Sequence, residues 1–185
     1  MKKEEKKDRR NIFVILTNRE YKGVAGYNVE GIAFDKETAR KIFKEWKKDR
    51  IKEFSDEIKD AEENGIELTN KTEFFLYNDN NRYYIEGKIT DCPCTIEVKK
   101  DKPAFVSVVA GLSDGNDIED CKVFASEQAA INWMKNQILD IKEEWESKLG
   151  KYISWHLDEK RECVDLESDE VSVSVFGFIK KIETL

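Results

Sequence analysis

The periodicity of apolar residues predicts two long amphipathic helices. One covers about residues 35–63 and ends at Asn64-Gly65, and the other covers about residues 126–149 and ends at Gly150. Apolar side chains spaced three and four residues apart lie on one face of a helix. The apolar stripe of the second helix consists of Ala130, Met134, Ile138, Ile141, Trp145 and Leu149, and that of the first of Ala39, Ile42, Phe43, Trp46, Phe54 and Ile58.

Strand-like segments flank each predicted helix in the same order, with two before the helix and three after it. In Val171–Val175, valines alternate with serines, which is the period-two pattern of an antiparallel strand half buried on a core. Residues 64–71 are expected to form an extra loop, and Gly23–Gly31 a hairpin or bulge region. The predicted strands are residues 12–18, 27–34, 72–78, 82–89 and 95–99 around the first helix, and 105–110, 118–124, 151–157, 161–167 and 171–179 around the second.

A short phrase occurs twice, ninety residues apart. The segment Ile32–Ala39 returns as Lys122–Ala129, so that Phe34 matches Phe124 and Glu37 matches Glu127. Each phrase ends a strand and opens a helix, and Asp35 and Ser126 are the candidate N-caps. After the helices the offset is expected to drop to about 78, because of the longer first helix and the extra loop. The pattern predicts an α+β fold built by tandem duplication of a ββαβββ unit, each antiparallel sheet covered by one helix.

The predicted domain organisation has three parts. Residues 1–10 are expected to form a charged, flexible tail, residues 11–100 the first copy, and residues 101–185 the second, acidic copy. Two prolines, Pro93 and Pro103, bracket the segment that joins the copies, which favours rigid packing of the two halves. A single continuous sheet with both helices on one face is the alternative.

Charge narrows the classes of partner. The chain carries 32 basic and 39 acidic side chains, a net charge of −7, which argues against general binding to nucleic acid or to an anionic membrane. No apolar run approaches the roughly 20 residues that span a bilayer. The first ten residues are too charged to begin an export signal, so a cytoplasmic location is expected.

The acidity is concentrated in the second copy. Residues 1–90 hold 20 basic and 19 acidic side chains, whereas residues 111–170 hold 7 basic and 16 acidic. A shared scaffold does not require this difference, and a negative surface can steer the chain toward a basic partner. Solubility is the competing explanation. The candidate partner-binding residues are Asp114, Asp117, Glu119, Asp120, Asp158, Glu159, Glu167, Asp169 and Glu170, with Tyr84 as a displayed aromatic anchor.

Catalytic and metal-binding motifs have little support. Cys92-Pro93-Cys94 lacks the spacing of a zinc knuckle, and the cysteines, which also include Cys121 and Cys163, are expected to be free thiols. His156 is the only histidine, and its predicted strand face, shared with Tyr152 and Ser154, contains no nucleophile motif. No catalytic residue, metal or cofactor is therefore predicted.

Two further patterns bear on ligand chemistry. Glycine-rich phosphate loops are missing from the sequence. Residues 114–120 contain four carboxylates but not the spacing of a calcium loop, so a hairpin turn is expected there.

The repeated phrase, a strand followed by Phe-x-x-Glu-x-Ala at the start of a helix (Phe34–Ala39, Phe124–Ala129), resembles that of small uncharacterised domains of phages and mobile elements. The resemblance covers about fifteen residues in each copy. It implies a class of small accessory proteins in a bacterial cytoplasm, which includes acidic inhibitors of nucleic-acid-binding defence enzymes such as anti-CRISPR proteins. It assigns no functional residue.

The leading hypothesis is a non-enzymatic binding protein that occludes a basic, nucleic-acid-binding surface of a protein partner, without itself binding nucleic acid or membrane. One alternative is a small enzyme that uses His156 with Tyr152, Ser154 or a cysteine. Another is a structural protein that associates with itself through an exposed sheet edge.

Overall fold

The structure, a computed structural model, describes residues 11–21, 24–53, 66–69, 73–78, 83–95, 97–150, 153–160 and 163–184. The predicted tail at residues 1–10, and the predicted apolar positions Phe54 and Ile58, lie outside the described residues. The chain divides into two compact units. The N-terminal unit comprises Asn11–Cys92 with Glu183–Leu185, and the C-terminal unit contains Pro93–Ile182.

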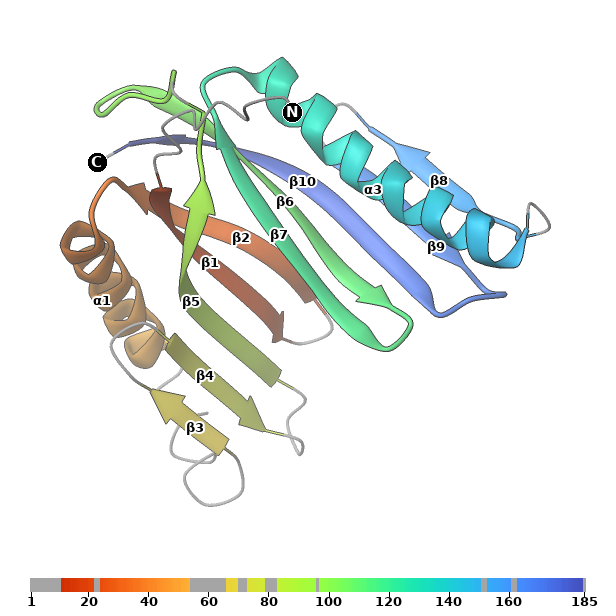
Figure 1. Ribbon diagram of the computed structural model, residues 1–185. Helices are drawn as coiled ribbons and strands as arrows, with labels where there is room; N and C mark the ends of the chain where they lie inside the picture. Colours follow the sequence, from red (N-terminus) through yellow and green to blue (C-terminus); the bar gives the residue numbers. More distant parts are fainter. Residues whose placement is uncertain are drawn as a thin grey trace, which may run out of the picture. The chain divides into compact units, whose positions relative to one another are not determined.

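The N-terminal unit is an antiparallel sheet with α1 against one face (Figure 1). Its strand order is β2-β1-β5-β4-β3. The end of the chain returns to this unit, where Thr184 forms a parallel bridge with Ile32. Its elements are β1 (Asn11–Tyr21), β2 (Val24–Ala33), α1 (Lys36–Glu53), β3 (Ile66–Thr69), β4 (Glu73–Asn78) and β5 (Tyr83–Pro93).

The C-terminal unit has the same arrangement, with α3 lying along its sheet (Figure 1). Its strand order, β7-β6-β10-β9-β8, repeats that of the N-terminal unit when each strand number is raised by five. The predicted α+β class with antiparallel sheets is confirmed. The elements are β6 (Pro103–Ser113), β7 (Asn116–Phe124), α3 (Glu127–Leu149), β8 (His156–Glu159), β9 (Cys163–Ser168) and β10 (Val173–Glu183).

The spacing between corresponding elements stays close to ninety residues along the whole chain. β1 begins at Asn11 and β6 at Pro103, 92 residues later, while β3 begins at Ile66 and β8 at His156, 90 residues later. The predicted drop to an offset of 78 is therefore wrong. It arose from two misplaced strands in the first half.

In the first half, the strands predicted after the helix are shifted by one strand from those in the structure. Residues 66–69, predicted as loop, form β3, because Ile66-Glu67-Leu68-Thr69 alternates with period two and pairs with β4. Thr95 and residues 97–99, predicted as parts of a strand, belong to no strand, and the Val98 amide donates to the Thr95 carbonyl at 3.1 Å. In the second half β8 begins only at His156, and Asp158 and Glu159, predicted as a turn, pair with Asp165 and Val164.

Both predicted N-caps are confirmed. The Thr38 amide donates to an Asp35 carboxylate oxygen at 2.8 Å, and the Ala129 amide donates to the Ser126 hydroxyl at 3.3 Å. These bonds satisfy backbone donors that a helix start otherwise leaves unpaired. α3 ends at Gly150, whose φ of 88° suits a glycine and whose amide donates to the Glu146 carbonyl at 2.9 Å.

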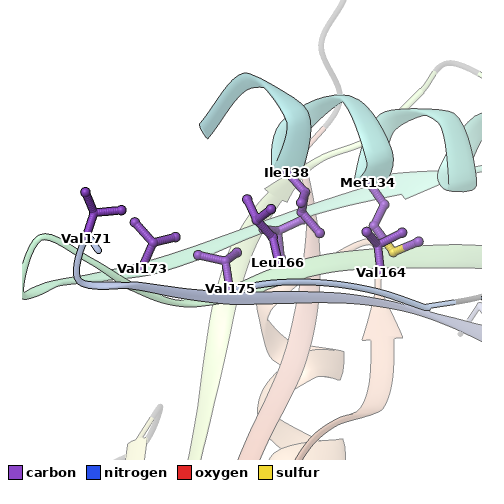
Figure 2. Close-up of a cluster of buried hydrophobic side chains, with 8 residues drawn as sticks. Met134, Ile138, Val164, Leu166, Val171, Val173 and Val175 are labelled. Carbon is purple, nitrogen blue, oxygen red and sulfur yellow. The ribbon is translucent and has the colours of Figure 1, made fainter. Parts of the chain in front are cut away.

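Each helix packs the described part of its predicted stripe against its own sheet, except Leu149 of α3, which is exposed. In the C-terminal unit, Met134 and Ile138 point from α3 toward valines and a leucine of the strands (Figure 2). Val171, Val173 and Val175 are buried while Ser172 and Ser174 are exposed, which confirms the predicted alternation. In the N-terminal unit the buried helix residues are Ala39 and Phe43, packed with Ile15, Ala33, Phe74 and Ile85.

Glycines on the central strand of each sheet, β5 and β10, let the helix of that unit lie close to the strand. A Cβ added at Gly87 of β5 would overlap the indole ring of Trp46. Ninety residues later, a Cβ at Gly177 of β10 would lie 2.5 Å from Cγ of Met134. In both units, a glycine at the same strand position thus leaves room for a side chain of the helix.

Among the described residues, neither helix is long and apolar enough to serve as a membrane span.

Candidate functional site

Two turns of the C-terminal unit meet at one end of its sheet. The β6–β7 turn contains Asp114 and Gly115, with φ of 54° and 72°, and the predicted hairpin turn is confirmed. The Asp114 amide donates to the carbonyl of Ser172 in the β9–β10 turn at 2.8 Å. This bond fixes the two turns side by side.

The two turns and the adjoining strand ends carry a group of exposed carboxylates, here called the acidic tip. Asp114 and Asp117 come from the β6–β7 hairpin, and Glu167, Asp169 and Glu170 come from the end of β9 and the turn after it. All five residues are exposed. Half of the predicted partner-binding residues are therefore brought to one end of one sheet.

The carboxylate of Glu170 also has a structural role within the unit. It accepts hydrogen bonds from the Ser154 amide at 3.2 Å and from the Ser168 hydroxyl at 3.1 Å. These bonds tie the segment before β8 to the β9–β10 turn. Asp114, Asp117 and Asp169 are therefore better positions for testing charge alone.

The remaining acidic candidates lie elsewhere in the unit. Asp158 and Glu159 end β8, at the opposite end of β9 from the acidic tip, and form ion pairs with Lys160 and Lys135 respectively. Glu119 and Asp120 follow each other along β7, so their side chains leave opposite faces of the sheet. These four residues are not part of the acidic tip.

The proposed aromatic anchor is partly packed within the other unit. Tyr84 lies on β5 of the N-terminal unit and is only half exposed. Its hydroxyl donates to Glu86, and its ring meets the ring of Phe75 edge-on at 5.3 Å between centroids. Tyr84 is therefore not one of the residues that define the acidic tip. The side chain of the neighbouring Tyr83 lies outside the described residues.

Two of the four cysteines are free, so the expectation of four free thiols is wrong for the other two. Cys94 is buried and Cys163 half-buried, whereas Cys92 and Cys121 are disulfide-bonded. Burial raises the pKa of the Cys163 thiol above its ordinary value of 9.0, and the nearby Asp165 carboxylate adds to the rise.

The described residues bring no three His, Cys, Asp or Glu side chains together as metal ligands. His156 is exposed on β8 opposite Glu167. Tyr152, its predicted neighbour, lies outside the described residues.

A second candidate site, which the sequence did not reveal, is a cavity of about 410 Å³ in the N-terminal unit. It lies where the apolar helix-covered face of β1 and β2 becomes polar, beside the last turns of α1. Its polar wall is built by Glu30, whose Oε1 accepts from the Thr17 hydroxyl at 3.1 Å and from Asn28 Nδ2 at 3.0 Å. The residues that line the cavity also include Arg19, Gly26, Trp46, Arg50 and Ile85.

A β-bulge places Glu30 at this wall. The β1–β2 register shifts between Ile15 and Leu16, whose partners are Gly31 and Val29, so Glu30 is an extra residue in β2. This confirms the bulge predicted for the glycine-containing segment. The corresponding β6–β7 register is continuous from Phe105 to Ser113. The bulge thus distinguishes the N-terminal unit from its counterpart.

Comparisons with protein-family models, with curated proteins and with solved structures find no match to this chain.

Proposed function

We propose that this protein is a non-enzymatic binding protein whose acidic tip docks on a basic surface of a protein partner and occludes it. The observation that carries the proposal is the hydrogen-bonded meeting of the β6–β7 and β9–β10 turns, which gathers five exposed carboxylates on a rigid sheet end. Acidic side chains on tight turns cost little to order on binding, because the backbone that holds them is already fixed.

We further propose that the two units arose by tandem duplication. Support comes from their equal strand order, the constant spacing of their elements, and the equivalent glycines at 87 and 177. The N-terminal unit has 14 basic and 18 acidic side chains and the C-terminal unit, over Pro93–Ile182, has 12 and 18, so the feature to be explained is the gathering of carboxylates at the acidic tip rather than the net charge. A selected interaction is a sufficient reason for that gathering.

The partner class follows from the charge. A surface that attracts a cluster of carboxylates carries several Lys and Arg side chains, as nucleic-acid-binding grooves do. The small accessory proteins that the repeated phrase implies include inhibitors that occlude such grooves, which makes a bacterial nucleic-acid-binding defence enzyme the proposed type of partner.

The test uses two variants with equal charge change. The tip variant carries Asp114→Asn, Asp117→Asn and Asp169→Asn, and asparagine preserves the positive φ that residue 114 needs. The control variant carries three substitutions at exposed carboxylates of the same unit but outside the tip, namely Asp101→Asn, Asp140→Asn and Glu143→Gln. Asp101 also has a positive φ, of 56°, so the strain is matched.

Affinity capture from a bacterial lysate then compares the two variants with the wild type. We expect the wild type and the control variant to retain a partner that the tip variant loses, and a short DNA duplex added in excess to displace it. Equal retention by the tip variant would contradict the proposal and leave solubility as the explanation of the acidity. Capture that DNA does not affect would exclude a nucleic-acid-binding groove as the docking surface.

A further inference from the structure

We propose that the cavity of the N-terminal unit binds a small organic anion, with its carboxylate or phosphate group at Arg50 and its apolar body against Trp46 and Ile85. A cavity of about 410 Å³ is within the range that takes a small organic molecule. The proposal concerns the opposite half of the chain from the acidic tip and does not depend on the proposed function.

Arg50 provides the strongest indication of an anionic group. Its terminal nitrogen pairs with Glu53, but its Nε atom is buried and makes no hydrogen bond among the described residues. A buried donor without an acceptor costs about 1–3 kcal/mol. The Nε atom has less than 1 Å² of accessible surface, so a ligand oxygen removes that cost once the guanidinium turns Nε toward the cavity. A planar guanidinium can present Nε–H and a terminal N–H together to one carboxylate or phosphate.

The other charged groups of the cavity are compatible with this polarity. Arg19 adds a second positive charge, and Glu30 is the negative one. The Glu30 carboxylate already accepts from Thr17 and Asn28, so it fixes the wall of the cavity in place. Preorganised polar groups of this kind lower the cost of binding.

The C-terminal unit shows that this fold can fill the same space with apolar side chains. Counting from matched strand and helix starts, Thr17, Gly26 and Arg50 correspond to Val109, Ile118 and Ile141. Val109 is fully buried, and Ile118 and Ile141 pack against the core. The N-terminal unit therefore keeps a polar cavity at a position where its counterpart is filled with core residues.

The cavity also lacks the features of a mere packing defect. Apolar voids left by imperfect packing are lined by apolar atoms, whereas this one is walled by a hydrogen-bonded carboxylate, an amide and two arginines. Another part of its wall is the indole of Trp46, stacked on Phe43 at 5.5 Å between ring centroids. A held aromatic ring beside cationic groups suits a ligand with a planar or apolar body.

The test is an NMR titration of the full chain with two probes, phenyl phosphate and benzoate. Trp46 is the only tryptophan of the N-terminal unit, and its indole N–H signal is assigned by its loss in Trp46→Phe. We expect a saturable shift of this signal at millimolar probe. A response to phenyl phosphate alone assigns the site to phosphates, and a response to benzoate alone assigns it to carboxylates. No shift with either probe up to about 10 mM, a free energy weaker than about −3 kcal/mol, would overturn the proposal.

Three variants locate the binding. Arg50→Gln is expected to weaken it at least tenfold, and Gly26→Ile to abolish it, because a Cβ at Gly26 meets no atom within 4 Å and the longer chain fills the cavity as Ile118 does. Lys48→Gln, an exposed position on the same helix, is the matched loss of one positive charge and should leave binding unchanged. Equal affinity in Arg50→Gln and the wild type would contradict the proposal. Should Arg50→Gln fail to fold, undiminished binding by Gly26→Ile contradicts it instead.

Discussion

At the scale of single residues, the absence of a side chain at two strand positions sets how closely each helix lies on its sheet. Gly87 faces the rigid indole of Trp46, and Gly177 faces the flexible chain of Met134. Because a methionine side chain can adjust its torsions and an indole ring cannot, the same substitution should have different costs in the two units.

Gly87→Ala is therefore expected to lower the free energy of unfolding by about 1–3 kcal/mol, and Gly177→Ala by less. Gly26→Ala is the control, since its added Cβ meets no atom within 4 Å. Urea denaturation of the three variants measures the differences. Equal stability of Gly87→Ala and the wild type would mean that the helix is not held at this distance.

The raised pKa of the Cys163 thiol predicts a slow reaction with alkylating reagents. Its thiol pKa is raised by burial and by Asp165, so the thiolate is scarce at neutral pH and alkylation by iodoacetamide should be slow. Asp165→Asn removes the second cause and should speed alkylation, while Asp169→Asn should not. Peptide mapping by mass spectrometry separates Cys163 from buried Cys94. An unchanged rate in Asp165→Asn would contradict the assignment.

The raised pKa of the Cys163 thiol also determines how the free energy of unfolding changes with pH. A thiol whose pKa is higher in the folded state contributes stability that is fully present below the ordinary value of 9.0 and is lost as pH rises through the folded value. Wild-type protein should accordingly lose slightly more stability than Cys163→Ser between neutral and strongly alkaline pH.

At the scale of elements, α3 is held by a hydroxyl cap at its start and an apolar stripe along its length. Ser126→Ala removes the cap and is expected to cost about 1 kcal/mol. Met134→Ala opens a cavity among fully buried residues and is expected to cost about 2–5 kcal/mol. Leu149→Ala, at a position 55% exposed, is the control and should cost little. Equal destabilisation by Met134→Ala and Leu149→Ala, measured by thermal unfolding, would contradict the packing.

The elements that the sequence predicted correctly are those with local signals. α3 has a capping serine, a stripe at steps of three and four, and a terminal glycine, and its bounds match the prediction within one residue. β3 was missed because its four residues lie in a segment that was predicted as loop. Residues 95–99 alternate like a strand, but Thr95 and residues 97–99 form none, and the Val98 amide bonds back to the Thr95 carbonyl. Pairing partners decided both cases, and a single sequence does not contain them.

The two candidate sites, the acidic tip and the cavity, could also be predicted from the sequence only in part. Carboxylates at turns were visible from composition, but their gathering at the acidic tip depends on the pairing of β6 with β10 and on the bond from the Asp114 amide to the Ser172 carbonyl. The cavity depends on a one-residue register shift that brings Glu30 beside Thr17 and Asn28. Polar residues directly after the apolar run of β1 were the only sequence signal for it.

At the scale of the whole molecule, the two units divide the chemistry between them. The N-terminal unit, with 14 basic and 18 acidic side chains, keeps a polar cavity, and the C-terminal unit, with 12 basic and 18 acidic side chains, fills that place with core residues and carries the acidic tip. A long-range negative potential acts on the rate of encounter more than on the strength of the final contact. The proposed docking therefore has a kinetic signature.

The most direct measurement is the association rate constant of the captured partner with wild type, tip variant and control variant, at about 0.05 M and about 0.5 M salt. Electrostatic steering by the acidic tip predicts a rate that falls steeply with salt for the wild type and the control variant. The tip variant should associate slowly at low salt and respond little to added salt. An association rate that is the same for all three proteins at low salt would contradict the account.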